Sequence, residues 1–137
     1  MTATSATAYK VLDENTQEAE VVEILEYDFD NDAGAQGDYN LGQFPHKALV
    51  TSAMVYIVTA CTSAGSATVE IGASTADADG FLDATSGAVA NLTIGTVHTE
   101  TTATNLIVAA DEYIQLTIGT ADLTAGKVRV IVKWIEL

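Results

Sequence analysis

Apolar and polar residues alternate along much of the chain, and an alternation with a period of two predicts β-strands with two different faces. The alternation is clearest in residues 126–137 and is repeated in residues 112–118. One face of the predicted last strand carries Val128, Val130, Val132 and Trp134, and the other carries Lys127, Arg129, Ile131, Lys133 and Ile135. We therefore expect this strand to bury one face and to leave a partly basic face outside.

Further strands are predicted where β-branched and aromatic residues gather, in residues 48–59, 67–72, 90–99 (one or two short strands) and 105–108. Residues 14–26 also fit a short helix, but the composition of residues 21–29 favours a strand. A turn at residues 61–66 predicts that the strands on either side of it form a β-hairpin. Residues 30–42, 73–88 and 122–126 are rich in Asp, Asn and Gly or in small residues, and are predicted to be turns and loops. Phe81 and Leu82 are expected to anchor the second of these loops under the sheet.

About seven or eight strands at roughly 8–12-residue spacing, without a convincing amphipathic helix after residue 26, predict an all-β fold. The expected architecture is an antiparallel β-sandwich that forms a single domain over residues 20–137. Residues 1–19 are expected to form an acidic N-terminal arm that precedes this domain. At 137 residues, the chain is long enough to bury a core of its own.

The charge is strongly negative, with 19 acidic and 5 basic residues and a formal net charge of −14. Ten of the acidic residues lie in the first 40 positions, and residues 48–126 contain neither Lys nor Arg. A nucleic-acid partner is not expected, because phosphate binding needs clustered Lys and Arg. Anionic membrane surfaces are disfavoured for the same reason. The N-terminus lacks a secretion signal and no apolar run reaches the ~20 residues of a membrane span, so a soluble protein made in a cytoplasm is expected.

Two clusters of aspartates are the candidate metal ligands. Asp28, Asp30 and Asp32 have the spacing of the first ligands of a calcium loop. The pattern fails afterwards, because Ala33 stands at the sixth position and Tyr39 at the twelfth. The second cluster consists of Asp77, Asp79 and Asp83. A turn explains the first cluster better than a metal site, so neither a metal nor another cofactor is expected. The same reasoning holds for the second cluster, which becomes a slightly better metal candidate if three chains bring their copies together.

Catalytic groups are equally scarce. Cys61 is the only cysteine, so it forms no internal disulfide, and it ends an apolar run where a small buried side chain is expected. His46 and His98 are isolated in the sequence and lack the spacing of zinc ligands. No acid–base pair or activated nucleophile stands out, and the sequence therefore predicts a protein that is not an enzyme.

Four segments carry a resemblance to a known class of proteins. A strand that ends in Ile-Gly (residues 67–72) leads into an Asp-rich stretch with an apolar anchor (residues 77–82). The alternating residues 113–118 and the Leu-Thr-Ala-Gly-Lys turn within residues 123–130 follow. In these features the chain resembles small structural proteins of tailed-bacteriophage virions, and most closely capsid decoration, or cement, proteins.

This resemblance implies a jelly-roll-like sandwich that forms a homotrimer. It also implies that the chain is made in the host cytoplasm, binds the major capsid protein on the outer surface of the virion and stabilises the head there. The resemblance covers residues 20–137 and has no counterpart for the acidic arm.

Candidate interface residues come from charge and from aromatic content. Lys127, Arg129 and Lys133 share one face of the last strand and complement the acidic N-terminal region, either between subunits or across strands of one chain. Tyr39 and Phe44 lie in a predicted loop, where they either anchor an interface or fill the end of the sandwich.

The alternative function is a glycan- or receptor-binding module of a head fibre or tail. Such a module needs exposed aromatic residues beside Asp, Asn or Gln. Tyr39 and Asn40, together with Gln43 and Phe44, form the one set of this kind in the sequence.

Overall fold

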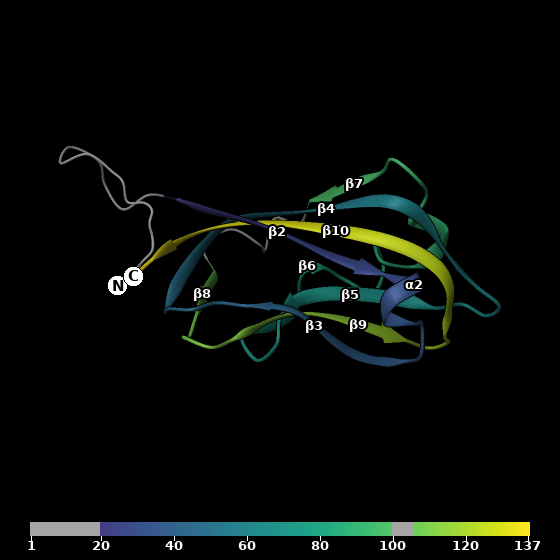
Figure 1. Cartoon of the computed structure of the whole chain (residues 1–137), viewed down its shortest axis with the longest axis horizontal. Coiled ribbons are helices and arrows are strands. Elements are labelled where there is room, and N and C mark those ends of the chain that lie inside the picture. Colours follow the sequence, from purple (N-terminus) through teal and green to yellow (C-terminus); the bar gives the residue numbers. More distant parts are fainter. Residues whose placement is uncertain (1–19, 100–105) are drawn as a thin grey trace.

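Two antiparallel sheets packed face to face form the computed structural model of this chain (Figure 1). The structure describes residues 20–99 and 106–137, so the expected arm over residues 1–19 lies outside the described residues. The five-stranded sheet contains β2 (Val21–Asp28), β10 (Leu123–Glu136), β4 (Ala48–Ser63), β7 (Val97–Thr99) and β8 (Leu106–Val108). The four-stranded sheet contains β3 (Gly37–Gln43), β9 (Tyr113–Gly119), β5 (Thr68–Ala73) and β6 (Asp77–Leu82). The prediction of an all-β antiparallel sandwich is confirmed.

The strand pairs are nested along the chain, and this order defines a jelly roll. The innermost pair is β5 with β6, followed outwards by β4 with β7, β3 with β9 and β2 with β10. The chain thus folds like one long hairpin that has been rolled up. The rolling brings β10 beside β4 in one sheet and β9 beside β5 in the other. The jelly-roll expectation is borne out by this strand order, and β8 is an additional short strand on β4.

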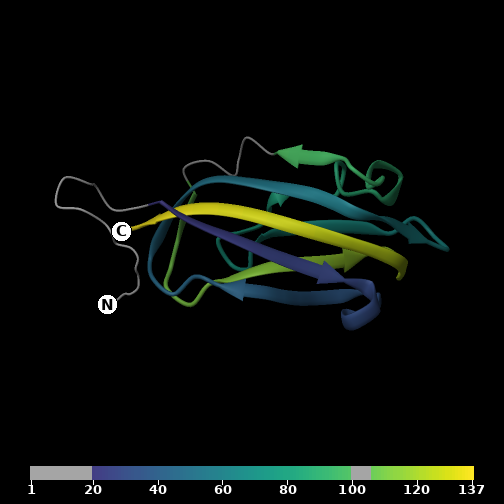
Figure 2. The same cartoon turned by 45° about the horizontal axis from the view of Figure 1, so that its top comes forward.

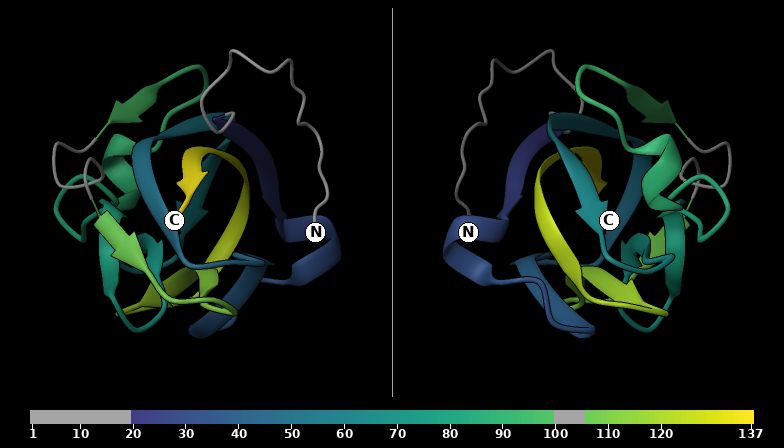
Figure 3. Two further views of the ribbon diagram at one scale, coloured as in Figure 1. Left: turned by 90° about the vertical axis from the view of Figure 1, so that its left-hand side faces the viewer. Right: turned by 90° about the vertical axis from the view of Figure 1, so that its right-hand side faces the viewer.

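The core lies between the sheets and is built mainly by strands with strict alternation. Figure 2 shows β10 running along the molecule between β2 and β4, and Figure 3 shows both sheets end-on. The inner residues of β10 are at most 4% exposed, as the alternation predicts, and they are Val128, Val130, Val132 and Trp134. The inner residues of β9 are equally buried, and they are Ile114, Leu116 and Ile118.

Two strands lie where turns and loops were predicted. Residues 30–42 include most of β3, and residues 73–88 include β6. Both are edge strands of the four-stranded sheet, since β3 pairs with β9 and β6 pairs with β5. An edge strand tolerates Asp, Asn and Gly, because one side of its backbone remains open to water. Phe81 and Leu82 do anchor this region, because both are completely buried.

The predicted hairpin between residues 48–59 and 67–72 is wrong, because these strands lie in different sheets. Strand β4 continues to Ser63 and pairs with β10, while β5 pairs with β6 and β9. Alternation identifies a strand, but its partner depends on contacts far away in the sequence. Residues 90–99 overlap the 3₁₀-helix η1 (Val89–Asn91), and only their last three residues form a strand, β7. The predicted turn at residues 122–126 mostly belongs to β10, which begins at Leu123.

Gly126 lies at a position in β10 that has no room for a side chain. The register between β10 and β4 shifts on both sides of Ala125, so the chain bulges there. Gly126 has a φ of 143°, and a Cβ atom at this position would lie 2.7 Å from Cys61 Sγ. Gly37 has the same φ of 143°, but a Cβ atom there would meet nothing within 4 Å. Substitutions at these two glycines therefore distinguish the cost of backbone strain from the cost of steric overlap.

We predict that Gly126→Ala lowers the free energy of unfolding by about 2–4 kcal/mol, because it adds overlap with Cys61 to an unfavourable φ. Gly37→Ala has the strain alone and should cost about 1–2 kcal/mol. Urea unfolding of both variants and the parent measures the difference. Equal losses in the two variants would show that the contact with Cys61 has no effect.

Candidate interaction surface

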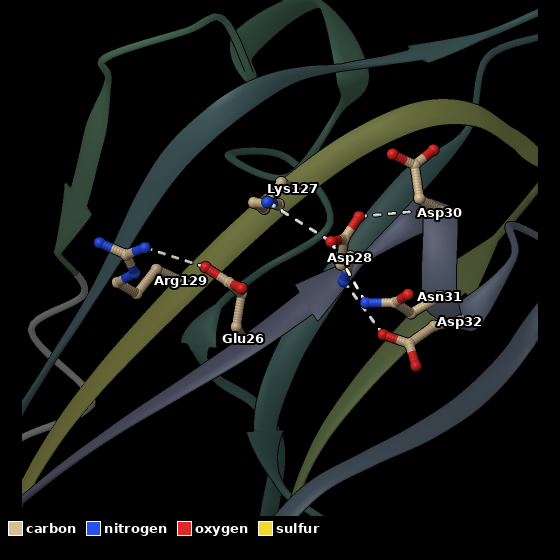
Figure 4. A network of polar contacts seen from close by, with 7 residues as sticks. All are labelled: Glu26, Asp28, Asp30, Asn31, Asp32, Lys127 and Arg129. Carbon is tan, nitrogen blue, oxygen red and sulfur yellow. Dashed lines mark hydrogen bonds and ion pairs between the residues drawn. The ribbon is translucent and has the colours of Figure 1, made fainter.

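Two ion pairs connect β2 and β10 on the outer face of the five-stranded sheet. Lys127 Nζ lies 3.4 Å from Asp28 Oδ2, and Arg129 Nη2 lies 3.0 Å from Glu26 Oε2 (Figure 4). Both pairs follow from the strand register, which places each cation directly opposite its acid. For Lys127 and Arg129, the complementarity between the basic last strand and the acidic N-terminal region is therefore satisfied within one chain. These pairs are partly exposed, so each contributes at most about 1 kcal/mol.

Lys133 lies on the same outer face of β10, but it has different neighbours. It is opposite Val22 on one side and Ser52 on the other. Among the described residues, no carboxylate lies within 4.0 Å of its ammonium group. This cation therefore remains available for a negative group outside the described part of the chain.

The first aspartate cluster forms the turn after β2 and uses its carboxylates to hold that turn. Asp28 caps the four-residue helix α2 (Phe29–Asp32), accepting a hydrogen bond of 3.0 Å from the Asp30 amide. Asp32 Oδ2 in turn accepts one from the Asp28 amide. The carboxylates of Asp30 and Asp32 point away from each other in Figure 4. This arrangement is that of a capped turn, and it leaves the three carboxylates without a common centre.

The second aspartate cluster lies at the edge of the four-stranded sheet. Burial and a hydrogen bond with Asp79 raise the pKa of the Asp77 carboxyl. Burial, together with the charges of Asp79 and Asp83, raises the pKa of Glu70 on the neighbouring strand β5. The acids of this cluster thus repel one another. Within residues 20–99 and 106–137, no group of three or more His, Cys, Asp or Glu residues has the geometry to hold a metal ion.

Tyr39 and Phe44 both make contacts inside the chain. Phe44 is completely buried, and its ring meets Trp134 edge-on with the centroids 6.0 Å apart. Tyr39 is half-buried in β3, and its ring meets Tyr27 edge-on at 5.5 Å. The Tyr39 hydroxyl donates to the Ala35 carbonyl at 2.6 Å and so holds the loop before β3. Phe44 therefore fills the sandwich, whereas Tyr39 keeps an accessible portion at the surface.

Glu112 is a structural site that the sequence analysis missed. Glu112 is 7% exposed, and its carboxylate accepts hydrogen bonds from the Thr75 hydroxyl at 2.6 Å and the Ala76 amide at 2.7 Å, with a third from the Thr75 amide. This clamp ties the turn between β5 and β6 to the start of β9. Burial would raise the pKa of Glu112, but the three hydrogen bonds outweigh it and hold the pKa below its ordinary value. A lone Glu before an alternating strand carries no signal of such a role.

The remaining side chains that could be reactive, one cysteine and two histidines, are buried or contact other groups of the chain. Cys61 is buried, as predicted, and burial raises the pKa of its thiol to about 11, which keeps it protonated near neutral pH. His46 Nδ1 lies 3.7 Å from Glu136 Oε2, and His98 Nε2 lies 3.1 Å from the Asn91 carbonyl. Among the described residues, no helix is both long and apolar enough to cross a membrane.

The fold is shared with chains of bacteriophage capsids. One similar chain belongs to the acidic stable capsid structure of Helicobacter pylori bacteriophage KHP30, with a TM-score of 0.60 and 16% identity. That match covers 87% of this chain and 90% of the other. A second belongs to the capsid asymmetric unit of cyanophage Pam1, with a TM-score of 0.56, 16% identity and full coverage of both chains. The predicted likeness to phage virion proteins is thus confirmed at the level of fold. No protein-family model and no curated protein sequence matches the chain.

We predict that Arg129→Glu lowers the free energy of unfolding by about 0.5–1 kcal/mol, because it places two glutamates opposite each other on β2 and β10. The double variant Glu26→Arg with Arg129→Glu should recover most of this loss. Lys47→Glu reverses the charge of an exposed lysine outside both strands, so it is the control and should change stability by less than about 0.5 kcal/mol. Chemical denaturation at low and high salt measures these values, and salt should reduce the loss. A double variant no more stable than the single one would contradict the pairing.

The Glu112 clamp gives a prediction on pH. A carboxylate whose folded pKa is lowered contributes stability above its ordinary pKa of 4.5, and loses it as the pH falls through the folded pKa. We expect Glu112→Gln to be about 1–3 kcal/mol less stable than the parent at pH 7, with the difference shrinking below pH 4.5. Asp111→Asn removes the same charge from an exposed neighbour and should leave stability almost unchanged. A constant difference between pH 7 and pH 3 would exclude the clamp as its cause.

Proposed function

We propose that the chain is a non-enzymatic structural protein of a bacteriophage virion, and that it acts as a capsid decoration, or cement, protein. The observation that carries the proposal is the jelly-roll fold shared with phage capsid chains over almost their whole length. Because coverage is high on both sides, the likeness is to entire chains of similar size and not to one domain of a larger protein. In this role the chain binds the major capsid protein on the outer surface of the head.

The surface chemistry of the chain supports a role in binding without catalysis. Several of the described titratable groups serve as turn caps, cross-strand pairs or the Glu112 clamp, and Cys61 is a buried, protonated thiol. A net charge of −14 keeps free copies soluble until they meet their target. The proposed mechanism is additive: each copy contacts the shell and its neighbours in a homotrimer, and many such contacts raise the barrier to rupture of the head.

The glycan- or receptor-binding alternative has weaker support. Of its proposed set of residues, Phe44 is completely buried and Gln43 donates to a backbone carbonyl. The Asn40 side chain accepts a hydrogen bond from Gln115. The half-buried Tyr39 is then the one aromatic residue of the set that retains an accessible portion.

We predict that the purified chain binds saturably to empty heads of the virus that encodes it when these heads are assembled without the chain. Bound heads should rupture at a higher temperature than undecorated ones, because each copy stabilises contacts between capsid subunits. Co-sedimentation measures binding, and a light-scattering melt measures rupture. Heads that already carry the chain are the control and should take up little more. Absence of binding to undecorated heads would overturn the proposed function.

A further inference from the structure

The outer face of the five-stranded sheet carries apolar side chains in rows across the strands. Ile131 on β10 lies opposite Ile24 on β2 and Met54 on β4, so three apolar residues cross the sheet side by side. The neighbouring row begins with the Glu26–Arg129 ion pair and continues with Tyr56 opposite Val97. At the far end of the sheet, a third row contains Ile135, Leu49 and Ile107. A sheet face of this kind is typical of an interface, because isolated sandwiches usually keep their outer faces polar.

The exposure of individual side chains singles out this face. Seven large hydrophobic side chains of the described residues are exposed, and four of them lie on this face. Their exposed fractions range from 52% to 63%, and they are Val22, Ile24, Val97 and Ile107. They belong to the three edge strands β2, β7 and β8, so the exposed apolar surface extends across the whole width of the sheet.

The charge of this face differs from that of the rest of the chain. Three of the five Lys and Arg residues lie on it, and its acids among the described residues are Glu26 and Asp28. Glu20 lies just before β2 and accepts a hydrogen bond from the Thr51 hydroxyl on β4. The outer face of the other sheet is acidic, because Asp38 and Glu70 lie on either side of Thr117. Two copies of a chain with a net charge of −14 repel each other least when this apolar face, whose acids are balanced by its cations, forms their contact. Lys133 then receives a carboxylate from the neighbouring copy, whose surface is rich in them.

We propose that the outer face of the five-stranded sheet is the surface through which the chain packs against a second copy of itself. This inference rests on the self-association contained in the proposed function, and it assigns that association to one face. The apolar rows provide the buried area, and Lys133 provides a charge that is complementary to the acidic neighbour. The ion pairs at Glu26 and Asp28 neutralise the acids that would otherwise repel the partner.

The test uses Ile24→Lys on this face and Tyr113→Lys on the outer face of the other sheet, where Tyr113 is 41% exposed. Both variants change the net charge from −14 to −13, so general repulsion is matched between them. Sedimentation velocity over a range of concentrations should show at least a tenfold weaker self-association for Ile24→Lys and a value close to the parent for Tyr113→Lys. Val97→Lys, at the opposite edge of the same face, repeats the test if Ile24→Lys fails to fold.

Three outcomes would overturn the inference: a parent chain that is monomeric at all concentrations, equal self-association in all variants, or a Lys variant of this face that stays associated and loses only binding to undecorated heads. The head-binding assay separates this result from the proposed function. A monomeric parent that still binds heads removes the inference and leaves the proposed function intact. A parent that associates through this face but never binds heads supports the inference and overturns the proposed function.

Discussion

The pairing of β10 on both of its sides is the constraint on which the rest of the structure depends. Because β10 lies between β2 and β4, its alternation determines what both neighbours bury. Its inner residues fill the core, and its outer residues place three cations on one surface. A shift of one residue in this register would exchange the two sets and bury Lys127, Arg129 and Lys133. The core and the charge of the outer face are therefore fixed together.

The sequence was informative wherever a strand has one buried and one outer face. The alternation in β9 and β10 correctly predicted which side chains are buried, and the composition of β2 correctly favoured a strand. It failed for β3 and β6, where edge strands retain Asp, Asn and Gly, and for the partner of β4. Nothing in a local pattern states that β4, which ends at Ser63, pairs with a strand that begins only at Leu123 and not with its neighbour in sequence.

The candidate site was predictable only in part, for a related reason. The basic face of β10 was visible as a pattern, but its partners on β2 required the register. Phe44 was ambiguous because its burial depends on Trp134, which is distant in the sequence. Glu112 carried no signal at all, since its three donors come from the turn between β5 and β6. Local sequence patterns do not reveal side chains whose contacts lie on strands or turns that are distant in the sequence.

Charged side chains at the edges of both sheets disfavour contact between the edges of two copies and favour contact between faces. Glu23 on the edge strand β2 is half-buried between the sheets, where burial raises its pKa and the nearby Trp134 indole lowers it to a lesser extent. An acid directed inward from an edge strand opposes the addition of another strand. The edges of the four-stranded sheet carry Asp38 on β3, and Asp77 and Asp79 on β6. Extending a sheet from one copy to another would bring these like charges together. The apolar outer face of the five-stranded sheet has no such barrier, because its acids already have partners within the chain.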